Sequence, residues 1–292
     1  MPQPSASAPR SQPAAAPKGK AAGKNGKGAP KKCKGKKCAP PPPAPCSPRW
    51  RPTVPQGYRN AVLSWHRPPT AHARTTADGY PFLTLEILNT GERLEVEPQT
   101  RTGRFSAADL DRLAHALRDT RRGNEHPFDP AVIDFVYDLQ VHFHADVIRV
   151  ISGYRTPGAH GHSNHGRGRA IDLIVPGTSD EDVAKYARSR GFTGVGTYPS
   201  SGFVHVDVRP SSYYWVDNSG PGQRNCEKAT RSAEARANDA LALAAGRRPP
   251  RPWTAPGSDV DAAWGERRSL SDTEVDDHDD SPEEDDLDDD HE

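Results

Sequence analysis

Three polar side chains in the second half of the chain have the types and spacing of ligands for one zinc ion. His165 and Asp172 lie seven positions apart, and His205 follows 33 positions later in an apolar run typical of a strand. Zinc binds imidazole nitrogen and carboxylate oxygen, and a catalytic zinc site uses three protein ligands and leaves a fourth position for water. The metal lowers the pKa of that water from about 15.7 toward 7 and polarises a carbonyl. The constellation predicts a zinc hydrolase with one Zn2+ as cofactor.

The surroundings of these residues strengthen the prediction. Asp172 stands among isoleucine and leucine in a predicted strand, where an acid is costly unless it is paired or bound to metal. Side chains alternate along residues 203–208, so the three valines face the core and His205 shares the opposite face with Asp207. Two roles are open for Asp207: the general base near the attacking water, or the acceptor for the second N–H of a metal-bound His205. A single histidine is more often a surface residue, but three positions in one pattern favour a metal site.

Other polar residues near this constellation are candidates for substrate contact. Arg155 follows a predicted buried strand over residues 146–154, and its guanidinium could bind a substrate carboxylate or stabilise an oxyanion. A surface salt bridge is the alternative for Arg155. His160 and His162 lie in a polar loop over residues 156–170, where substrate contact, ligand replacement and plain loop polarity all stay open.

The elements needed to position these residues indicate an α+β protein. Periodicity, capping residues and turn signals decide between helix and strand. Strands are predicted over residues 60–65, 82–88, 93–97, 146–154, 171–175, 195–198 and 203–208, and helices after Ser106, after Asp129, from Ser179 to Gly191, and over 227–245.

Charge and composition divide the chain. The 39 Lys and Arg balance 39 Asp and Glu, yet residues 1–49 hold eleven Lys and Arg and no acid, and residues 271–292 hold fourteen acids and no Lys or Arg. Such segments cannot bury enough apolar surface to offset chain entropy. We predict a disordered basic head over 1–55, a peptidase domain over 56–222, a peripheral Ala-rich helix over 223–247 and a disordered acidic tail over 248–292.

Cysteine usage and hydropathy bear on the compartment. Cys33, Cys38 and Cys46 lack the Cys-x-x-Cys spacing of a structural zinc site, and with Cys226 they could form disulfides in an exported protein, in a pairing that the sequence leaves open. No run approaches the ~18 apolar residues of a membrane span, so no transmembrane segment is expected. No signal peptide is expected either, because the longest apolar run near the start is residues 14–16.

Three motifs in order resemble those of a known family. They are Ser152-Gly-Tyr-Arg155, Ser163-x-His165-x-x-Gly168-x-Ala170-x-Asp172 and Phe203-Val-His205-Val-Asp207. The chain resembles the zinc D-Ala-D-Ala carboxypeptidases and murein endopeptidases of the lysostaphin, D-alanyl peptidase and hedgehog superfamily. The nearest branch is the YcbK-like one, the murein endopeptidase K type. The resemblance covers residues 80–215 and includes Leu88-Asn-Thr-Gly-Glu92, Leu117-Arg-Asp119, Asp129-Pro130 and Gly194-Val-Gly-Thr-Tyr-Pro199.

The resemblance implies a fold and a set of roles. It implies a single small α+β domain with an antiparallel sheet flanked by helices, hedgehog/D,D-peptidase-like. It implies His165, Asp172 and His205 as the zinc ligands, and Arg155 as the residue that contacts substrate and polarises the scissile carbonyl. The implied substrates are peptidoglycan stem peptides and their cross-links.

The sequence departs from many relatives just before the last ligand. Where they carry a catalytic acid or a histidine, this chain has Gly202 and Phe203, and neither can carry a proton. We therefore assign Asp207 as the group that takes or orients the proton, with the role of a partner to His205 as the alternative.

The resulting hypothesis is a monomeric zinc metallopeptidase, a carboxypeptidase or an endopeptidase, in the periplasm or cell envelope. Its expected partners are peptidoglycan peptides, with no specific nucleic acid. Whether it cleaves the carboxy-terminal D-Ala, a 4-3 cross-link or a 3-3 cross-link stays open. A non-catalytic zinc-containing module that binds cell-wall peptide is one alternative, and a polyanion-binding protein acting through its basic head is another.

Overall fold

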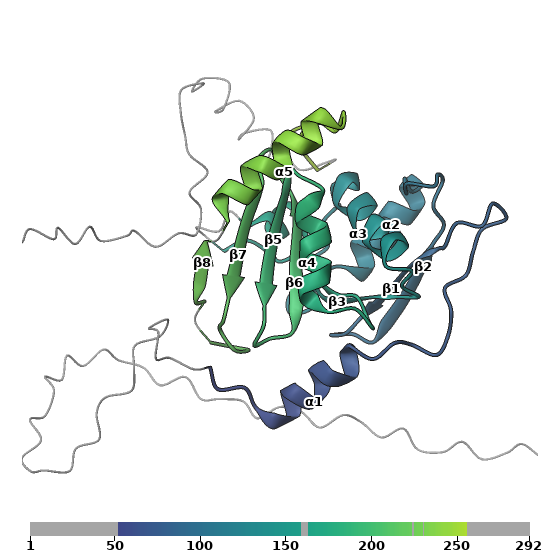
Figure 1. Cartoon of the computed structure of the whole chain (residues 1–292). Coiled ribbons are helices and arrows are strands. Elements are labelled where there is room, and N and C mark those ends of the chain that lie inside the picture. Colours follow the sequence, from purple (N-terminus) through teal and green to yellow (C-terminus); the bar gives the residue numbers. More distant parts are fainter. Residues whose placement is uncertain (1–51, 159–162, 224, 230, 256–292) are drawn as a thin grey trace, which may run out of the picture. The chain divides into compact units, whose positions relative to one another are not determined.

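The structure is a computed structural model that describes residues 52–158, 163–223, 225–229 and 231–255 (Figure 1). Most of the predicted basic head and acidic tail lies outside the described residues. So do three of the four cysteines and two of the candidate histidines: Cys33, Cys38, Cys46, His160 and His162. Predictions for these parts therefore stay predictions.

The described residues form helices and one sheet, which confirms the predicted α+β class. In chain order the elements are α1 (Gln56–Trp65), β1 (Leu83–Ile87), β2 (Glu92–Val96), α2 (Ala107–Ala116), α3 (Pro130–His142), β3 (Ile148–Ser152), the 3-10 helix η1 (Asn164–Arg167), β4 (Ala170–Ile174), α4 (Asp180–Ser189), β5 (Thr193–Tyr198), β6 (Phe203–Val208), β7 (Tyr213–Asp217), β8 (Glu227–Ala229) and α5 (Ser232–Ala244).

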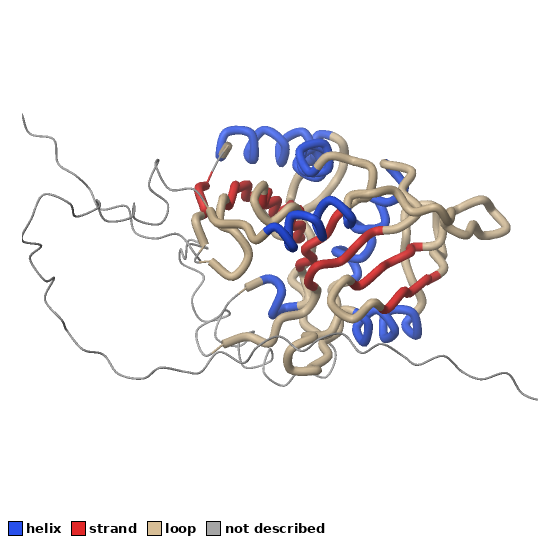
Figure 2. The backbone as a smooth tube through the Cα atoms, turned by 90° about the horizontal axis from the view of Figure 1, so that it is seen from below, coloured by secondary structure: helices blue, strands red, loops and turns tan. Residues whose placement is uncertain are grey.

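Eight strands join in one sheet in the order β2-β1-β3-β4-β6-β5-β7-β8. Neighbouring strands are antiparallel except for the pairs β1–β3 and β5–β7, which are parallel. The sheet is strongly twisted: strands seen end-on at one side of Figure 2 give way to strands seen lengthwise at the other. The middle strands β4 and β6 carry two of the three predicted ligands.

One face of the sheet builds the core. Along β4 and β6, the aliphatic residues Ile171, Leu173, Val204 and Val206 are fully buried, and α3 and α4 pack over this side. The prediction that alternate valines of residues 203–208 face the core is therefore confirmed. Because side chains alternate, the intervening polar residues of the same strands must project from the other face.

Three predicted helix starts are confirmed by their caps. The side chains of Ser106 and Ser179 accept hydrogen bonds from backbone N–H groups three residues on, and Asp129 accepts from Ala131 with Pro130 in the first helical turn. Such caps satisfy backbone donors that have no partner inside the helix.

The prediction of a strand over residues 60–65 is wrong, because Gln56–Trp65 is the helix α1. The six residues of the predicted strand are too few to show helical spacing. In the helix, Tyr58 and Trp65 lie two turns apart, and their rings are in edge contact with 5.5 Å between centroids. The helix lies against the β5–β6 turn, where Tyr58 donates to the carbonyl of Ser201 at 2.9 Å (Figure 1). No residue of α1 is fully buried, so its apolar signal was weak.

The predicted helix over residues 227–245 begins later than expected. Glu227–Ala229 instead pairs with β7 as the edge strand β8, and the helix α5 covers Ser232–Ala244. Arg231, with a positive φ of 68°, turns the chain between the two. Backbone pairing with β7, which local sequence does not reveal, overrides the helical propensity of these residues.

Candidate metal centre

Different elements deliver the three predicted ligands to the polar face of the sheet. Asp172 in β4 and His205 in β6 are direct cross-strand partners. His165 lies in η1, which is capped by Ser163, whose hydroxyl accepts from the His165 N–H, and is followed by Gly168 with φ of 63°. A Cβ at Gly168 would lie 2.2 Å from the carbonyl oxygen of Pro127, so glycine is required where this turn meets the loop before α3.

The ligand atoms converge at a spacing suited to one metal ion. His205 Nδ1 lies 2.8 Å from Asp172 Oδ1 and 3.1 Å from His165 Nε2, and the last pair, His165 Nε2 and Asp172 Oδ1, is 3.3 Å apart. Ligand atoms placed about 2.0–2.1 Å from a tetrahedral zinc are roughly 3.3 Å from one another. His165 and Asp172 are 2 % exposed and His205 is 7 % exposed. The cluster therefore has the size and burial of a metal site.

Each imidazole presents a lone pair to the cluster because its other nitrogen has an acceptor. His165 Nδ1 lies 2.7 Å from the carbonyl oxygen of Gly153, so it carries the proton and leaves Nε2 free to coordinate. His205 Nε2 lies 3.1 Å from Asp207 Oδ2, so it carries the proton and leaves Nδ1 free. Such outer partners fix the tautomer of metal-binding histidines.

Asp207 lies behind His205, on the side away from Asp172. It is fully buried and accepts from Gly194 N–H at 3.1 Å and from Arg209 Nε at 2.7 Å. Burial alone would raise the pKa of this carboxyl, but Arg209 outweighs burial and holds the pKa far below the usual range. A weakly basic carboxylate locked behind the imidazole favours the second role left open by the sequence, that of a partner to His205.

Arg155 reaches the cluster from the β3 side. Its Nη2 donates to Asp172 Oδ2 and lies 2.8 Å from His165 Nε2, and its Nε donates to Ser152 Oγ at 2.9 Å. The position between the ligand atoms of His165, Asp172 and His205 therefore favours a positive charge. More than half of the Arg155 side chain is exposed, so the guanidinium also borders solvent beside the cluster.

At Asp172 and His165 the electrostatics favour the protonation state that binds zinc, whereas at His205 the hydrogen bonds to Asp172 and Asp207 outweigh burial and raise the pKa. Burial alone would raise the pKa of Asp172, but His165 and Arg155 outweigh it and hold the pKa well below the usual carboxyl range. Burial lowers the pKa of His165, which keeps the imidazole neutral. Zinc binds a carboxylate and a neutral imidazole, so neither group must lose a proton at neutral pH.

Two aromatic residues beside the cluster are not among the predicted site residues. The ring centroid of Trp215 in β7 lies 5.0 Å from that of His205, and the indole donates to the hydroxyl of Tyr198 at 3.1 Å. The run Tyr-Tyr-Trp-Val-Asp over β7 has strong strand propensity and could have revealed the strand. Nothing local in it indicates contact with His205.

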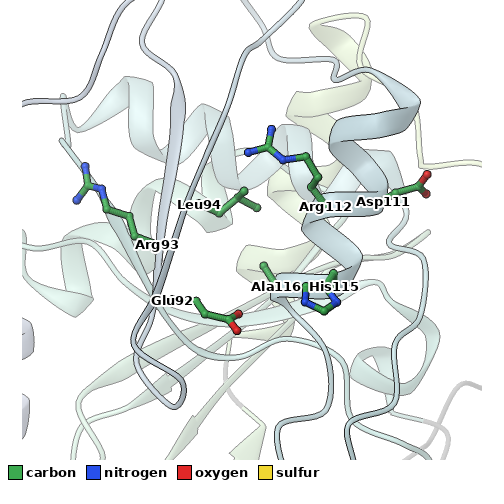
Figure 3. A pocket seen from close by; sticks show the side chains of 7 residues that line it. All are labelled: Glu92, Arg93, Leu94, Asp111, Arg112, His115 and Ala116. Carbon is green, nitrogen blue, oxygen red and sulfur yellow. The ribbon is translucent and has the colours of Figure 1, made fainter. Parts of the chain in front are cut away.

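A groove lined by none of these ligands lies between β2 and α2 (Figure 3). Its charged groups have partners of their own: Arg118 pairs with Glu92 at 2.7 Å, and His115 lies 2.7 Å from Glu125. The groove is therefore better explained as a surface depression between the β1–β2 hairpin and α2 than as a metal site. Its lining residues are Glu92, Arg93, Leu94, Asp111, Arg112, His115 and Ala116.

An α+β domain with a His-Asp-His cluster on the polar face of its sheet is consistent with a metal-dependent peptidase. The family model described as "Peptidoglycan L,D-endopeptidase MepK", of the M15 peptidases, matches residues 75–214, close to the region of the resemblance seen in the sequence. The chain belongs to this family.

Two curated relatives illustrate the similarity. The probable peptidoglycan L,D-endopeptidase MepK of Haemophilus influenzae is 37% identical over 143 residues, which cover 44% of this chain and 76% of that protein. The peptidoglycan L,D-endopeptidase MepK of Escherichia coli K12 is 31% identical over 159 residues, covering 50% of this chain and 87% of the relative. No solved structure matches the chain significantly.

Proposed function

We propose that this protein is a zinc-dependent peptidoglycan L,D-endopeptidase with His165, Asp172 and His205 as its metal ligands. The observation that carries the proposal is the convergence of the three ligand atoms, with both imidazoles oriented by acceptors behind them. The names of the relatives support the substrate class, since they are described as enzymes acting on peptidoglycan. The finer choice of endopeptidase over carboxypeptidase rests on those names alone.

The residues present fit a zinc ion in donor chemistry, spacing and tautomer. A bound zinc ion supplies a Lewis acid that activates water near neutral pH and polarises the carbonyl to be cleaved. Gly153 and Asp207 hold the two imidazoles so that each offers one lone pair to the ion. Because the two imidazoles are already oriented without metal, less side-chain ordering is needed when zinc binds.

Arg155 is the group that we assign to substrate. Its guanidinium borders both the ligand cluster and solvent, and it offers N–H donors to a carboxylate or to a carbonyl oxygen that gains charge. Asp207 is assigned as a positioning residue for His205. Its ion pair with Arg209 keeps it ionised and in place, which suits an acceptor and not a base.

The test is a single substitution with two readouts. His165→Ala should abolish stoichiometric zinc binding and cleavage of purified muropeptides, because two ligands hold zinc poorly. His115→Ala is the matched control, since His115 lies on α2 in the groove of Figure 3 and should affect neither. Cleavage that persists in metal-free His165→Ala would overturn the proposal.

Mass spectrometry of digested sacculi decides which bond is cut. An L,D-endopeptidase releases monomers from cross-links whose amide joins an L-centre to a D-centre. Loss of a terminal D-Ala with cross-links intact would identify a carboxypeptidase instead. Zinc binding without any cleavage would favour the non-catalytic cell-wall binding module.

The cell envelope is the compartment that we propose. Peptidoglycan lies outside the cytoplasm, and Cys226 is buried and disulfide-bonded, a state that persists in oxidising compartments. Among the described residues, no helix has the length and apolar character to cross a bilayer. Fractionation of cells with blocked thiols would test both compartment and disulfide.

A further inference from the structure

One row of residues runs across four strands of the sheet and includes two of the proposed ligands. Asp172 in β4 pairs with His205 in β6, His205 pairs with Gly196 in β5, and Gly196 pairs with Trp215 in β7. Residues paired in register project from the same face. Trp215 therefore lies in the same row as Asp172 and His205, and only Gly196 separates it from His205.

The indole of Trp215 fills the space above Gly196. A Cβ built on Gly196 would lie 2.3 Å from Cε2 of the indole and 2.6 Å from Nε1. The glycine thus lets the indole cross β5 and approach the imidazole of His205, with 5.0 Å between ring centroids.

Tyr198 completes this arrangement. It lies two residues beyond Gly196 in β5, so it projects from the same face, and its hydroxyl accepts a hydrogen bond from Trp215 Nε1 at 3.1 Å. Its ring stacks on Phe203 at 4.4 Å. Within the described part of the chain, the indole is the hydrogen-bond partner of this hydroxyl, and it uses a lone pair. The O–H proton of Tyr198 remains available for donation.

Local electrostatics keep that proton on the phenol. Burial raises the pKa of Tyr198, and the carboxylate of Asp172 raises it further. The phenol is therefore neutral throughout the physiological range and acts as a donor. The hydroxyl is bonded to the indole whose ring lies 5.0 Å from that of His205, which places the hydroxyl on the β5 side of the ligand cluster. Tyr198 as a whole is only partly buried.

We propose that the Tyr198 hydroxyl donates a hydrogen bond to the oxygen of the scissile amide as charge develops there, an inference that rests on the proposed function. Arg155 reaches the cluster from the β3 side, whereas Tyr198 reaches it from the β5 side. A substrate carbonyl over the cluster would meet one donor from each direction. Trp215 is then a positioning residue, because it holds the phenol without meeting substrate.

The chemical step needs no proton from Tyr198. The oxygen of water bonds to the amide carbon while the π electrons of the carbonyl move to its oxygen. Tyr198 stabilises the resulting negative charge and keeps its proton. When the C–N bond breaks, that charge returns to reform the carbonyl, and the amine leaves with a proton that came from the water. Donors aimed at the developing charge lower the barrier without reorganising.

Tyr198→Phe tests this role because it keeps the ring and its stack on Phe203 but removes the hydroxyl. The zinc-loaded variant should keep its zinc Kd and its KM for a muropeptide, and should lose roughly 10²-fold in kcat, as when one oxyanion donor is removed. Its affinity for a phosphinate analogue of the cleaved dipeptide, measured by calorimetry without turnover, should fall by a similar factor. Affinity for an uncleaved product peptide should not change.

Two further variants control the experiment. Tyr213→Phe removes a hydroxyl from the neighbouring strand β7, where it donates to Glu227 at 3.0 Å, and should leave all of these quantities unchanged. Trp215→Phe keeps a ring but removes the N–H that holds Tyr198, so kcat should fall by about three- to tenfold, the value of one neutral hydrogen bond.

The possible outcomes separate this inference from the proposed function. An active wild type with a Tyr198→Phe kcat within twofold of it, or with unchanged phosphinate affinity, overturns the inference alone. A loss of kcat matched by an equal loss of bound zinc assigns Tyr198 a structural role and also overturns it. A wild type that binds zinc but cleaves no muropeptide overturns the proposed function itself.

Discussion

Replacement of Asp207 by asparagine tests whether this buried carboxylate prepares His205 for metal. The two carboxylate oxygens serve four donors. Oδ1 accepts from Gly194 N–H at 3.1 Å and from Arg209 Nε at 2.7 Å, and Oδ2 accepts from Arg209 Nη2 at 2.5 Å and from His205 Nε2 at 3.1 Å. Asparagine preserves this shape but offers a single acceptor oxygen and an NH2 group. Either orientation of the amide must therefore leave two donors facing an NH2.

Each orientation of the amide has a distinct cost. With the NH2 toward His205, the imidazole gains a donor at Nε2 and shifts its proton to Nδ1, the nitrogen that faces Asp172. With the NH2 toward Gly194, a buried backbone donor and one guanidinium donor of Arg209 lose their acceptor, which costs about 1–3 kcal/mol. The first orientation leaves one Arg209 donor unpaired and the second leaves two donors unpaired, so we expect the first, which weakens metal binding as well as the fold.

The expected magnitude follows from these losses. Loss of an outer partner of a metal-bound histidine typically weakens metal affinity by about 10- to 100-fold, or roughly 1.4–2.7 kcal/mol. For Asp207→Asn we expect a zinc Kd raised by this factor, measured by competition with a chromophoric chelator. The metal-free variant should also lose about 1–3 kcal/mol in its free energy of unfolding in urea.

Asp239→Asn is the matched control for this prediction. Asp239 in α5 also accepts from two backbone N–H groups, of Phe192 at 2.7 Å and Ser212 at 2.9 Å, but it is remote from the ligand cluster. It should lose stability and keep the wild-type zinc Kd. If Asp207→Asn binds zinc within twofold of wild type while losing as much stability as this control, the reasoning about His205 is refuted.

Two further predictions concern neighbouring parts of the site. Gly196→Ala places a Cβ 2.3 Å from the indole of Trp215, so it should cost about 1–3 kcal/mol of stability and lower kcat. Gly57→Ala is the control, because a Cβ there has nothing within 4 Å and should change neither quantity. Equal urea midpoints for the two variants would contradict this prediction. Asp119 accepts from Thr156 N–H, and such bonds outweigh burial and lower its pKa from 3.8 to about 2. Because the folded pKa is depressed, its stabilisation of about 2 kcal/mol is present above pH 4 and lost as pH falls to 2. Asp119→Asn should flatten this acid slope in urea titrations, and parallel slopes would count against it.

The residues of the His165, Asp172 and His205 cluster could be predicted from the sequence because their signals are local. His165 and Asp172 share one short segment, and alternation along residues 203–208 separates His205 from the buried valines. An acid between aliphatic residues is improbable without a partner, so the neighbours of Asp172 alone indicate a functional role. What local pattern left open was the pairing of β4 with β6, which brings Asp172 opposite His205.

The role of Asp207 could not be decided from the strand pattern. A carboxylate two residues from His205 on the same face suits a base beside the substrate and a partner behind the imidazole equally well. The feature that favours a partner behind the imidazole is that Nε2 of His205 faces Asp207, whose carboxylate Arg209 and the Gly194 N–H hold in place. These contacts join residues of different strands, so no single segment encodes them.

The sheet register shows which side chains the two glycines of β5 make room for. A Cβ at Gly194 would lie 2.1 Å from a carboxylate oxygen of Asp207, and one at Gly196 would lie inside the indole of Trp215. Glycine inside a strand costs stability, so two at alternate positions argue for close approach from neighbours on one face. That inference was available from the sequence. The identity of the neighbours was not, because Trp215 reaches Gly196 through a parallel pairing of β5 with β7 that skips over β6 in the chain.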